Sequence, residues 1–331
     1  MATRLETEFL GADQIAAWDA LVDRAPHATV FQSTRWTNAL ADAFGRRGRI
    51  LGVFRNGVLV GGVPTYERHF AGLAMTNPPV VAGYAGVLLD LPEYERSGRS
   101  ISETEQILEA LVAGVRERFA FARFTHAPGL ADTRPFQWAG WRVTPRYTYR
   151  IAPRESEEML ASFEHNARKK IRRAEEAGLV VQRVEKTSEL ISAYAASYRR
   201  HRTPPPVPES VLSTLADRLL REGIARAYVV RGADGADHAF QIQIADAHAS
   251  YAWIAGTAPE HMAEGGFSLM LWKILRDASE ANVVFDFMGA NTPTIARFKR
   301  AFGGELAPYW ETLHATRVAR ALVVIRHLGR G

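Results

Sequence analysis

The pattern of hydrophobic and polar residues predicts the same order of helices and strands twice, as one block in each half of the chain. The first block opens with a predicted helix over residues 31–44, where four-residue spacing gathers three large apolar side chains on one face: Trp36, Leu40 and Phe44. Two strands are predicted next, residues 50–55 and 58–66. The intervening Asn56-Gly57 is a strong signal for a two-residue hairpin turn. The rest of this block predicts one further helix and two strands, at residues 102–119, 138–143 and 147–151.

The second block repeats this order and extends it. Its pattern predicts two helices, three strands, a long helix and a last strand, in turn residues 191–200, 209–222, 227–231, 238–245, 250–255, 267–280 and 283–288. A basic amphipathic helix is expected over the tail, residues 313–328. The repetition indicates an internal duplication in a chain of the α/β (α+β) class. We therefore predict two domains, residues 1–153 and 154–331.

The amino-acid composition excludes several kinds of functional site. The 331 residues include no cysteine, which excludes disulfides, iron–sulfur clusters, thiolate zinc sites and a cysteine nucleophile. Ten histidines are present, but none shows metal-ligand spacing, so no metal is expected. The first residues carry no apolar signal-peptide segment, and no apolar run approaches the roughly 20 residues that span a bilayer. We expect a cytoplasmic protein without a transmembrane segment.

The net charge of +5 is distributed unevenly. Residues 165–173 concentrate five cations, and four of them are candidate phosphate or donor contacts: Arg168, Lys169, Arg172 and Arg173. Such a cluster attracts the phosphates of RNA or of a nucleotide. A solvated helix face explains the same pattern, and the sequence leaves both interpretations open.

The segment 283–304 carries the most specific chemistry. A buried strand with one acid, Asp286, is followed by a turn that contains Asn291. A short helix then presents Lys299 and ends at Gly303-Gly304. A cation just beyond a strand end is well placed to hold a developing negative charge. An ordinary strand–helix junction with a solvated lysine is the alternative.

Three segments resemble the Fem-like acyltransferases, a branch of the GNAT superfamily that includes the peptidoglycan bridge-forming aminoacyltransferases. The closing motif is Asp286-Phe287-Met288-Gly289 followed by residues 297–304, Arg-Phe-Lys-Arg-Ala-Phe-Gly-Gly. A basic helix running into a Gly-Val strand covers residues 166–181, and a Gln/Ser–Trp element covers residues 31–36. The resemblance implies two tandem GNAT-like domains, each a mixed twisted sheet flanked by helices. It also implies transfer of an acyl or aminoacyl group to a primary amine.

The resemblance assigns roles to particular residues. Lys299 matches the family's motif lysine and is expected to stabilise the oxyanion or the leaving group. Asp286, the nearest acid, is a candidate base or amine-orienting group, with a purely structural buried acid as the alternative. Further substrate-binding candidates are Arg35 and Trp36, which match the element near the family's acceptor cleft, Asn291, and a predicted polar and aromatic floor of Gln241, Gln243, Tyr251 and Trp253.

The donor is left open between two co-substrates, and no tightly bound cofactor is expected. GNAT acetyltransferases hold the CoA pyrophosphate in a basic, glycine-rich loop before the main helix. Here Gly265 and Gly266 are available, but Glu264 has the wrong charge, so we favour aminoacyl-tRNA over acyl-CoA. The expected partners are a small-molecule or cell-wall amine acceptor and tRNA, without DNA. A degenerate GNAT domain that only binds its ligand is the remaining alternative. The sequence does not identify the acyl group, the acceptor or the oligomeric state.

Overall fold

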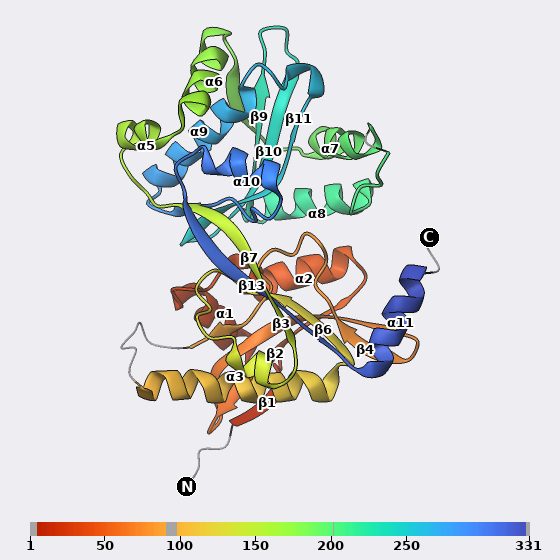
Figure 1. Cartoon of the computed structure of the whole chain (residues 1–331). Helices are drawn as coiled ribbons and strands as arrows, with labels where there is room; N and C mark the ends of the chain where they lie inside the picture. Colours follow the sequence, from red (N-terminus) through yellow and green to blue (C-terminus); the bar gives the residue numbers. More distant parts are fainter. Residues whose placement is uncertain (1–4, 91–97, 201, 329–331) are drawn as a thin grey trace. The chain divides into compact units, whose positions relative to one another are not determined.

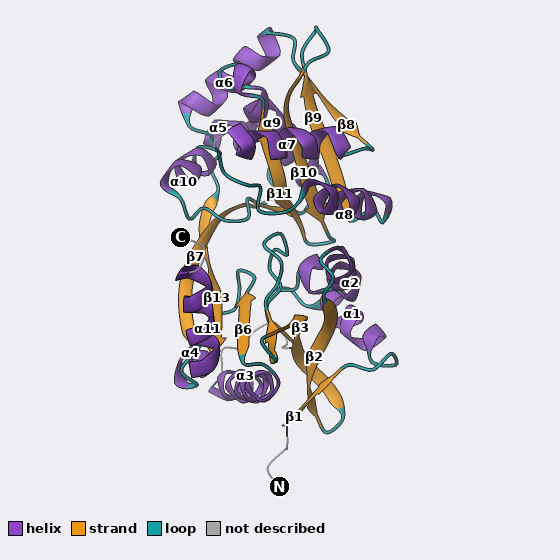
Figure 2. Ribbon diagram, turned by 90° about the vertical axis from the view of Figure 1, so that its right-hand side faces the viewer, coloured by secondary structure: helices purple, strands orange, loops and turns teal. Residues whose placement is uncertain are grey.

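The computed structural model describes residues 5–90, 98–200 and 202–328 (Figures 1 and 2). The chain forms two compact units: unit 1 comprises Met1–Arg146 and Pro308–Gly331, and unit 2 comprises Tyr147–Ala307. Strands β7 (Arg142–Ile151) and β13 (Glu305–Ala315) contain the two points at which the chain passes between units. The division into domains of residues 1–153 and 154–331 stays a prediction.

In unit 1, the strand order is β1-β2-β3-β4-β6-β13, and β5 pairs with β3. The additional strands are β1 (Leu5–Phe9), β2 (Arg47–Arg55), β3 (Val58–Phe70), β4 (Leu73–Thr76), β5 (Leu88–Leu89) and β6 (Phe121–Thr125). The helices are α1 (Ile15–Arg24), η1 (Val30–Gln32), α2 (Thr34–Ala43), α3 (Gly98–Arg118), α4 (Arg134–Trp138) and α11 (Arg317–Leu328). The predicted hairpin turn is confirmed, since Asn56 and Gly57 both have positive φ.

In unit 2, the strand order is β7-β12-β11-β10-β9-β8. The additional strands are β8 (Val180–Val184), β9 (Ala225–Arg231), β10 (Asp237–Ala245), β11 (Ala249–Thr257) and β12 (Val284–Asp286). The helices are α5 (Ser156–Ser162), α6 (His165–Glu176), α7 (Ser188–Arg200), α8 (Glu209–Arg221), η2 (Pro259–His261), α9 (Gly266–Glu280) and α10 (Pro293–Arg300). In Figure 1, α6 and α9 lie to one side of β9–β11, and α7 and α8 lie to the other.

Both units contain one parallel strand pair in an otherwise antiparallel ladder. The pair is β4 and β6 in unit 1 and β11 and β12 in unit 2, each joined across a helix, α3 or α9. A parallel pair needs such a crossover because its connection must return to the starting edge. The predicted fold class, two tandem domains with mixed sheets flanked by helices, is confirmed.

For two predicted elements, the structure has a different type of secondary structure. Residues 138–143 do not form a strand of their own, since only the last two belong to a strand, β7. Helix α4 ends at Trp138, whose ring is exposed, and the backbone turns at Gly140 (φ +76°) before β7 begins. The tail is not one helix from residue 313, because β13 continues to Ala315 and α11 begins at Arg317.

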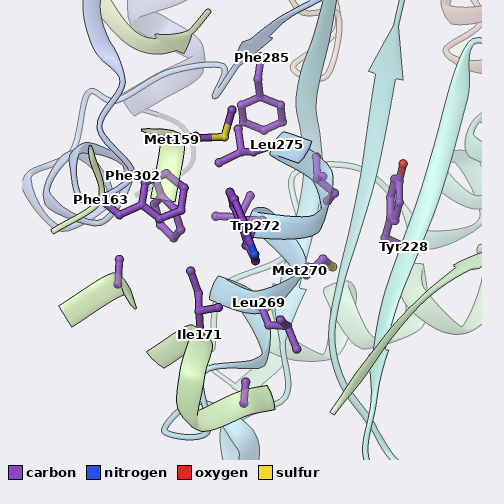
Figure 3. Close-up of a cluster of buried hydrophobic side chains, with 14 of the residues drawn as sticks. Met159, Phe163, Ile171, Tyr228, Leu269, Met270, Trp272, Leu275, Phe285 and Phe302 are labelled. Atoms are coloured by element: carbon purple, nitrogen blue, oxygen red, sulfur yellow. The ribbon is translucent and has the colours of Figure 1, made fainter. Parts of the chain in front are cut away.

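The core of unit 2 packs α5 and α6 against α9 (Figure 3). Phe163 makes edge-to-face contacts with Trp272 and Phe302, at centroid distances of 5.6 and 5.2 Å. Ile171 and Met270 are buried in the same cluster. This core fixes the start of α9 close to α6.

Gly265, the N-cap of α9, packs directly against the backbone of α6. Its φ is +83°, and a Cβ added there would lie 2.3 Å from the carbonyl oxygen of Lys170. Both the backbone conformation and the contact with rigid helix backbone therefore require glycine.

We expect Gly265→Ala to lower the free energy of unfolding by about 3 kcal/mol or more, because it adds a clash to an unfavourable φ. Gly178→Ala is the matched control: its φ is +70°, but nothing lies within 4 Å of the added Cβ. The control should cost only about 1 kcal/mol. Urea unfolding monitored by circular dichroism measures both, and equal losses would contradict the packing account.

Candidate active site

Strands β11 and β12 pair over three residues only, ending at Tyr251 opposite Asp286. Strand β12 then ends, while β11 continues to Thr257. Within the described chain, no ladder pairing joins residues 252–257 to β12. A bulge at Trp253 accompanies this split, because Ala252 pairs with Gln243 whereas Ile254 pairs with Ile242.

The chain makes a tight turn directly after β12. Met288 and Gly289 have φ of +52° and +91°, and the left-handed conformation is unfavourable for a methionine. Asp286 stabilises the turn: its Oδ1 accepts hydrogen bonds from the backbone N–H of Met288 and from the hydroxyl of Thr148, both at 2.7 Å. The carboxylate is 1% exposed, and Arg150 Nε lies 3.7 Å from Oδ2.

Lys299, on α10, fixes the same turn from the other side. Its ammonium donates hydrogen bonds of 2.6 Å to the carbonyl oxygens of Phe287 and Gly289. Burial lowers the pKa of Lys299 to about 8, and the nearby charge of Asp286 partly opposes this shift. An ammonium has three N–H donors, and the described residues supply no third acceptor.

The turn therefore holds the Lys299 ammonium, with one N–H still available, beside the point where β11 and β12 separate. Such a preorganised donor stabilises an oxyanion without reorganising at the moment of reaction. A pKa near 8 keeps Lys299 largely charged at neutral pH while leaving its proton transferable.

Tyr251 and Asn291 lie beside this turn. Tyr251 pairs with Asp286 across the strands and is buried, which raises its pKa well above the ordinary value. Its hydroxyl donates to Asp246 at 3.1 Å. Asn291 accepts a 2.9 Å hydrogen bond from the backbone N–H of Tyr147, so it anchors the exit of the turn to β7.

Gln243 does not share a face with Tyr251, contrary to the predicted floor. Tyr251 pairs with Ile244, the neighbour of Gln243, and neighbouring residues in a strand point to opposite faces. Gln241 and Gln243 do share one face, and the oxygen of Gln243 accepts the hydroxyl of Ser250 at 2.7 Å.

Gln241 has a buried side-chain amide without hydrogen-bond partners in the described part of the chain. It is 1% exposed, and neither its amide oxygen nor its nitrogen has a hydrogen-bond partner among the described residues. Buried amides without partners are rare because they are costly. Its cross-strand neighbour Ala255 is exposed and lies in the part of β11 beyond the split. A substrate group reaching that stretch could bind the amide.

The predicted phosphate contacts divide into two kinds. Arg168 is structural, because its guanidinium donates to the carbonyls of Ala161 and Phe163, at 2.9 and 2.5 Å, and so closes the α5–α6 junction. The other three predicted contacts, Lys169, Arg172 and Arg173, are exposed, as is the neighbouring Lys170. Gly265 and Gly266 start α9, with Gly265 packed on α6 as described above.

Arg35 and Trp36 belong to unit 1. Arg35 is exposed, at the start of α2. Trp36 is fully buried, donates to the carbonyl of Ala82 at 3.1 Å and packs edge-to-face on Phe31. In this conformation the indole serves the core of unit 1.

Known proteins share this fold and part of this sequence. A family model described as an acetyltransferase (GNAT) domain matches residues 161–300, which include Asp286 and Lys299. The chain carries a GNAT acyltransferase domain. No curated protein sequence matches it.

Solved structures extend the similarity over the whole chain. FemX superposes with a TM-score of 0.69 at 15% identity, covering 92% of this chain and 96% of FemX. The C-terminal domain of a putative lysylphosphatidylglycerol synthetase from Agrobacterium fabrum gives 0.57 at 13% identity, with 95% of each chain covered. A tandem GNAT protein from the clavulanic acid biosynthesis pathway gives 0.50 at 14% identity, covering 93% of this chain and 98% of its own.

At these identities the structural comparisons concern the fold alone. The family match confirms a GNAT domain over residues 161–300, and FemX shares the fold of the whole chain. Across the described residues, no helix combines the length and the apolar character that crossing a membrane requires.

Sequence reasoning missed the partners that hold the site. Thr148 bonds Asp286 across 138 positions of sequence, and no local pattern signals such a contact. His261 and Glu264 stand three residues apart and meet His238 in space. The spacing of His261 and Glu264 is visible in the sequence, whereas the approach of His238, from β10, is not.

We expect Gln241→Leu to raise the free energy of unfolding by about 1–3 kcal/mol, because it removes an unsatisfied buried amide. If the amide binds substrate, KM rises in the same variant. Gln243→Leu is the control: it removes one unpartnered amide nitrogen but leaves the buried Ser250 hydroxyl without its acceptor, and should bring no net gain. Urea unfolding and steady-state kinetics measure the two effects. A Gln241→Leu protein that is less stable than the wild type would show that the amide is satisfied.

Proposed function

We propose that this protein transfers an aminoacyl group from aminoacyl-tRNA to a primary amine, with Lys299 as the catalytic cation. The observation that carries the proposal is the Lys299 ammonium, fixed by two carbonyls beside the split between β11 and β12. Cytoplasmic location remains part of this proposal.

The reaction requires few groups. The amine nitrogen attacks the ester carbonyl and forms a C–N bond, and the carbonyl oxygen becomes an oxyanion. The remaining N–H of Lys299 stabilises that oxyanion. The C–O bond to the ribose then breaks, the leaving oxygen takes up a proton, and the amine nitrogen loses one. Asp286 acts as a positioning residue, since its carboxylate is occupied with Thr148 and the turn.

Two features favour an RNA donor over CoA. The loop before α9 holds a carboxylate, Glu264, which contacts His238 and His261. A negative charge there opposes a pyrophosphate at the helix N-terminus. The exposed α6 cations Lys169, Arg172 and Arg173 suit a phosphodiester backbone. The name lysylphosphatidylglycerol synthetase, which a structural neighbour carries, also denotes an aminoacyl product.

Acyl-CoA is the second candidate donor. It is favoured by the family model, which describes an acetyltransferase domain, and the tandem GNAT neighbour is described as a structure without AcCoA.

The acceptor amine has a candidate pocket in unit 2. A cavity of about 430 Å³ lies between α7 and the ends of β10 and β11. Three acids, one cation and several apolar groups line it, among them Glu189, Asp237, Glu260, Arg199, Leu190 and Phe240. Acids on an apolar wall suit a protonated amine on arrival.

The rate of transfer should fall as pH rises through about 8, because Lys299 then loses the charge that stabilises the oxyanion. Lys299→Arg keeps its charge at every pH used, so its profile should lose this alkaline limb. Lys299→Met should lower the rate about 100-fold or more while retaining the circular dichroism spectrum. The pH dependence of single-turnover rates measures this. An unchanged alkaline limb in Lys299→Arg would assign the titration to another group.

Binding of charged tRNA should weaken about 10-fold or more in the triple variant Lys169→Ala, Arg172→Ala, Arg173→Ala, and its dependence on salt should become shallower. Calorimetry at low and moderate salt measures this, with acetyl-CoA titrated in parallel. The control removes Arg221 and Arg226, exposed cations elsewhere in unit 2, and should bind as the wild type. Saturable acetyl-CoA binding without a tRNA signal would contradict the RNA donor and establish the second candidate.

A further inference from the structure

Three side chains with metal-ligating atoms meet in front of α9. His238 comes from β10, His261 from η2 and Glu264 from the loop that follows, and their ligating atoms lie within 4.8 Å of one another. Each carboxylate oxygen faces one imidazole: Oε2 lies 2.8 Å from Nδ1 of His238, and Oε1 lies 3.2 Å from Nδ1 of His261. Among the described residues, no other such group of potential ligands is found.

His238 supplies a second, independent observation. Its side chain is 7% exposed, and Nδ1 makes no aligned hydrogen bond despite its short distance to Glu264. The distance establishes proximity, and the missing alignment leaves a buried ligand atom unsatisfied. A buried polar atom without a partner is costly. This atom faces the carboxylate and the second imidazole, where an ion would satisfy it.

We propose that His238, His261 and Glu264 bind a divalent transition metal, with Zn²⁺ the best fit, and leave its fourth position to water or an exogenous ligand. Two imidazoles and one carboxylate are a ligand set that zinc uses. Zinc–ligand bonds of about 2.0–2.2 Å place tetrahedral ligand atoms about 3.3 Å apart. The observed nitrogen–oxygen separations of 2.8 and 3.2 Å, which involve the two different carboxylate oxygens, are close to this spacing.

Coordination also requires one ring to turn. The imidazoles are stacked, with centroids 3.6 Å apart and planes 5° from parallel, so one ion cannot lie in both ring planes. His261 is the ring that turns, because it lies on a three-residue 3₁₀ turn and is more exposed than His238. His238 is held in place by its strand.

The surroundings of His238 suit a fixed ligand. A Cβ at Gly232 would lie 2.6 Å from His238 Nε2. Glycine at position 232 leaves the room that the ring occupies.

Metal binding would change the charge in front of α9. Glu264 alone contributes one negative charge, whereas the ion and Glu264 together contribute one positive charge. The ion would also tie β10, η2 and the start of α9 together. A bound ion would therefore crosslink these elements and reverse the sign of the local charge.

The experiment titrates metal-free, tag-free wild-type protein with Zn²⁺ by calorimetry and with Co²⁺ by visible absorption. We expect one equivalent to bind, a tetrahedral Co²⁺ spectrum that Zn²⁺ abolishes, and a higher melting temperature with Zn²⁺. His261→Ala and Glu264→Gln should each weaken binding by more than about 10-fold. His165→Ala removes an exposed histidine from the start of α6 and should bind as the wild type.

Circular dichroism of each metal-free variant verifies its fold, so that lost binding is not mistaken for unfolding. The absence of stoichiometric binding by the wild type would overturn the proposal. Binding that survives in both ligand variants, or that weakens equally in His165→Ala, would overturn it as well. These outcomes are independent of the donor and of transfer activity.

Discussion

The hydrogen bonds from the Lys299 ammonium to the carbonyls of Phe287 and Gly289 are the interaction on which the candidate site depends. They hold a turn that an unfavourable methionine φ would otherwise oppose, and Asp286 supports that turn from the opposite side. The same bonds keep a positive charge half-buried, which lowers the pKa of Lys299 to about 8. Structure and chemistry therefore share one group: the ammonium that stabilises the turn is also the proposed oxyanion donor.

The split of the sheet follows from the same region. Strand β12 ends at Asp286 because the following residues enter the left-handed turn, while β11 continues past its bulge at Trp253. The backbone edge opened in this way lies on the same unit as two features of opposite charge. One is the Glu264 carboxylate in front of α9, and the other is the exposed cationic face of α6. Their signs bear on the proposed donor: in the metal-free protein, the α6 cations suit an RNA backbone, whereas Glu264 opposes a pyrophosphate.

Much of this fold could be predicted from the sequence, because periodicity reports which face of an element is buried. Asn56-Gly57 predicted the hairpin turn, and the sequence around Asp286 and Lys299 predicted the order of strand, turn and helix. The bulge at Trp253 was not readable, since one extra residue changes which side chains share a face without altering the apolar pattern. Gln243 and Tyr251 were therefore assigned to one floor that the structure does not form. Long-range contacts such as Thr148 with Asp286, and His238 with Glu264, depend on tertiary packing that no local spacing encodes.

The most direct test of this account is the titration of the Lys299 side chain itself. The chain has only five lysines, so selective ¹³C labelling gives few NMR signals, and Lys299→Arg identifies the one of interest. The account predicts that this signal titrates near pH 8. Titration at the ordinary lysine value of about 10.5 would show that the ammonium is not held as described, and would contradict its role in both the turn and the chemistry.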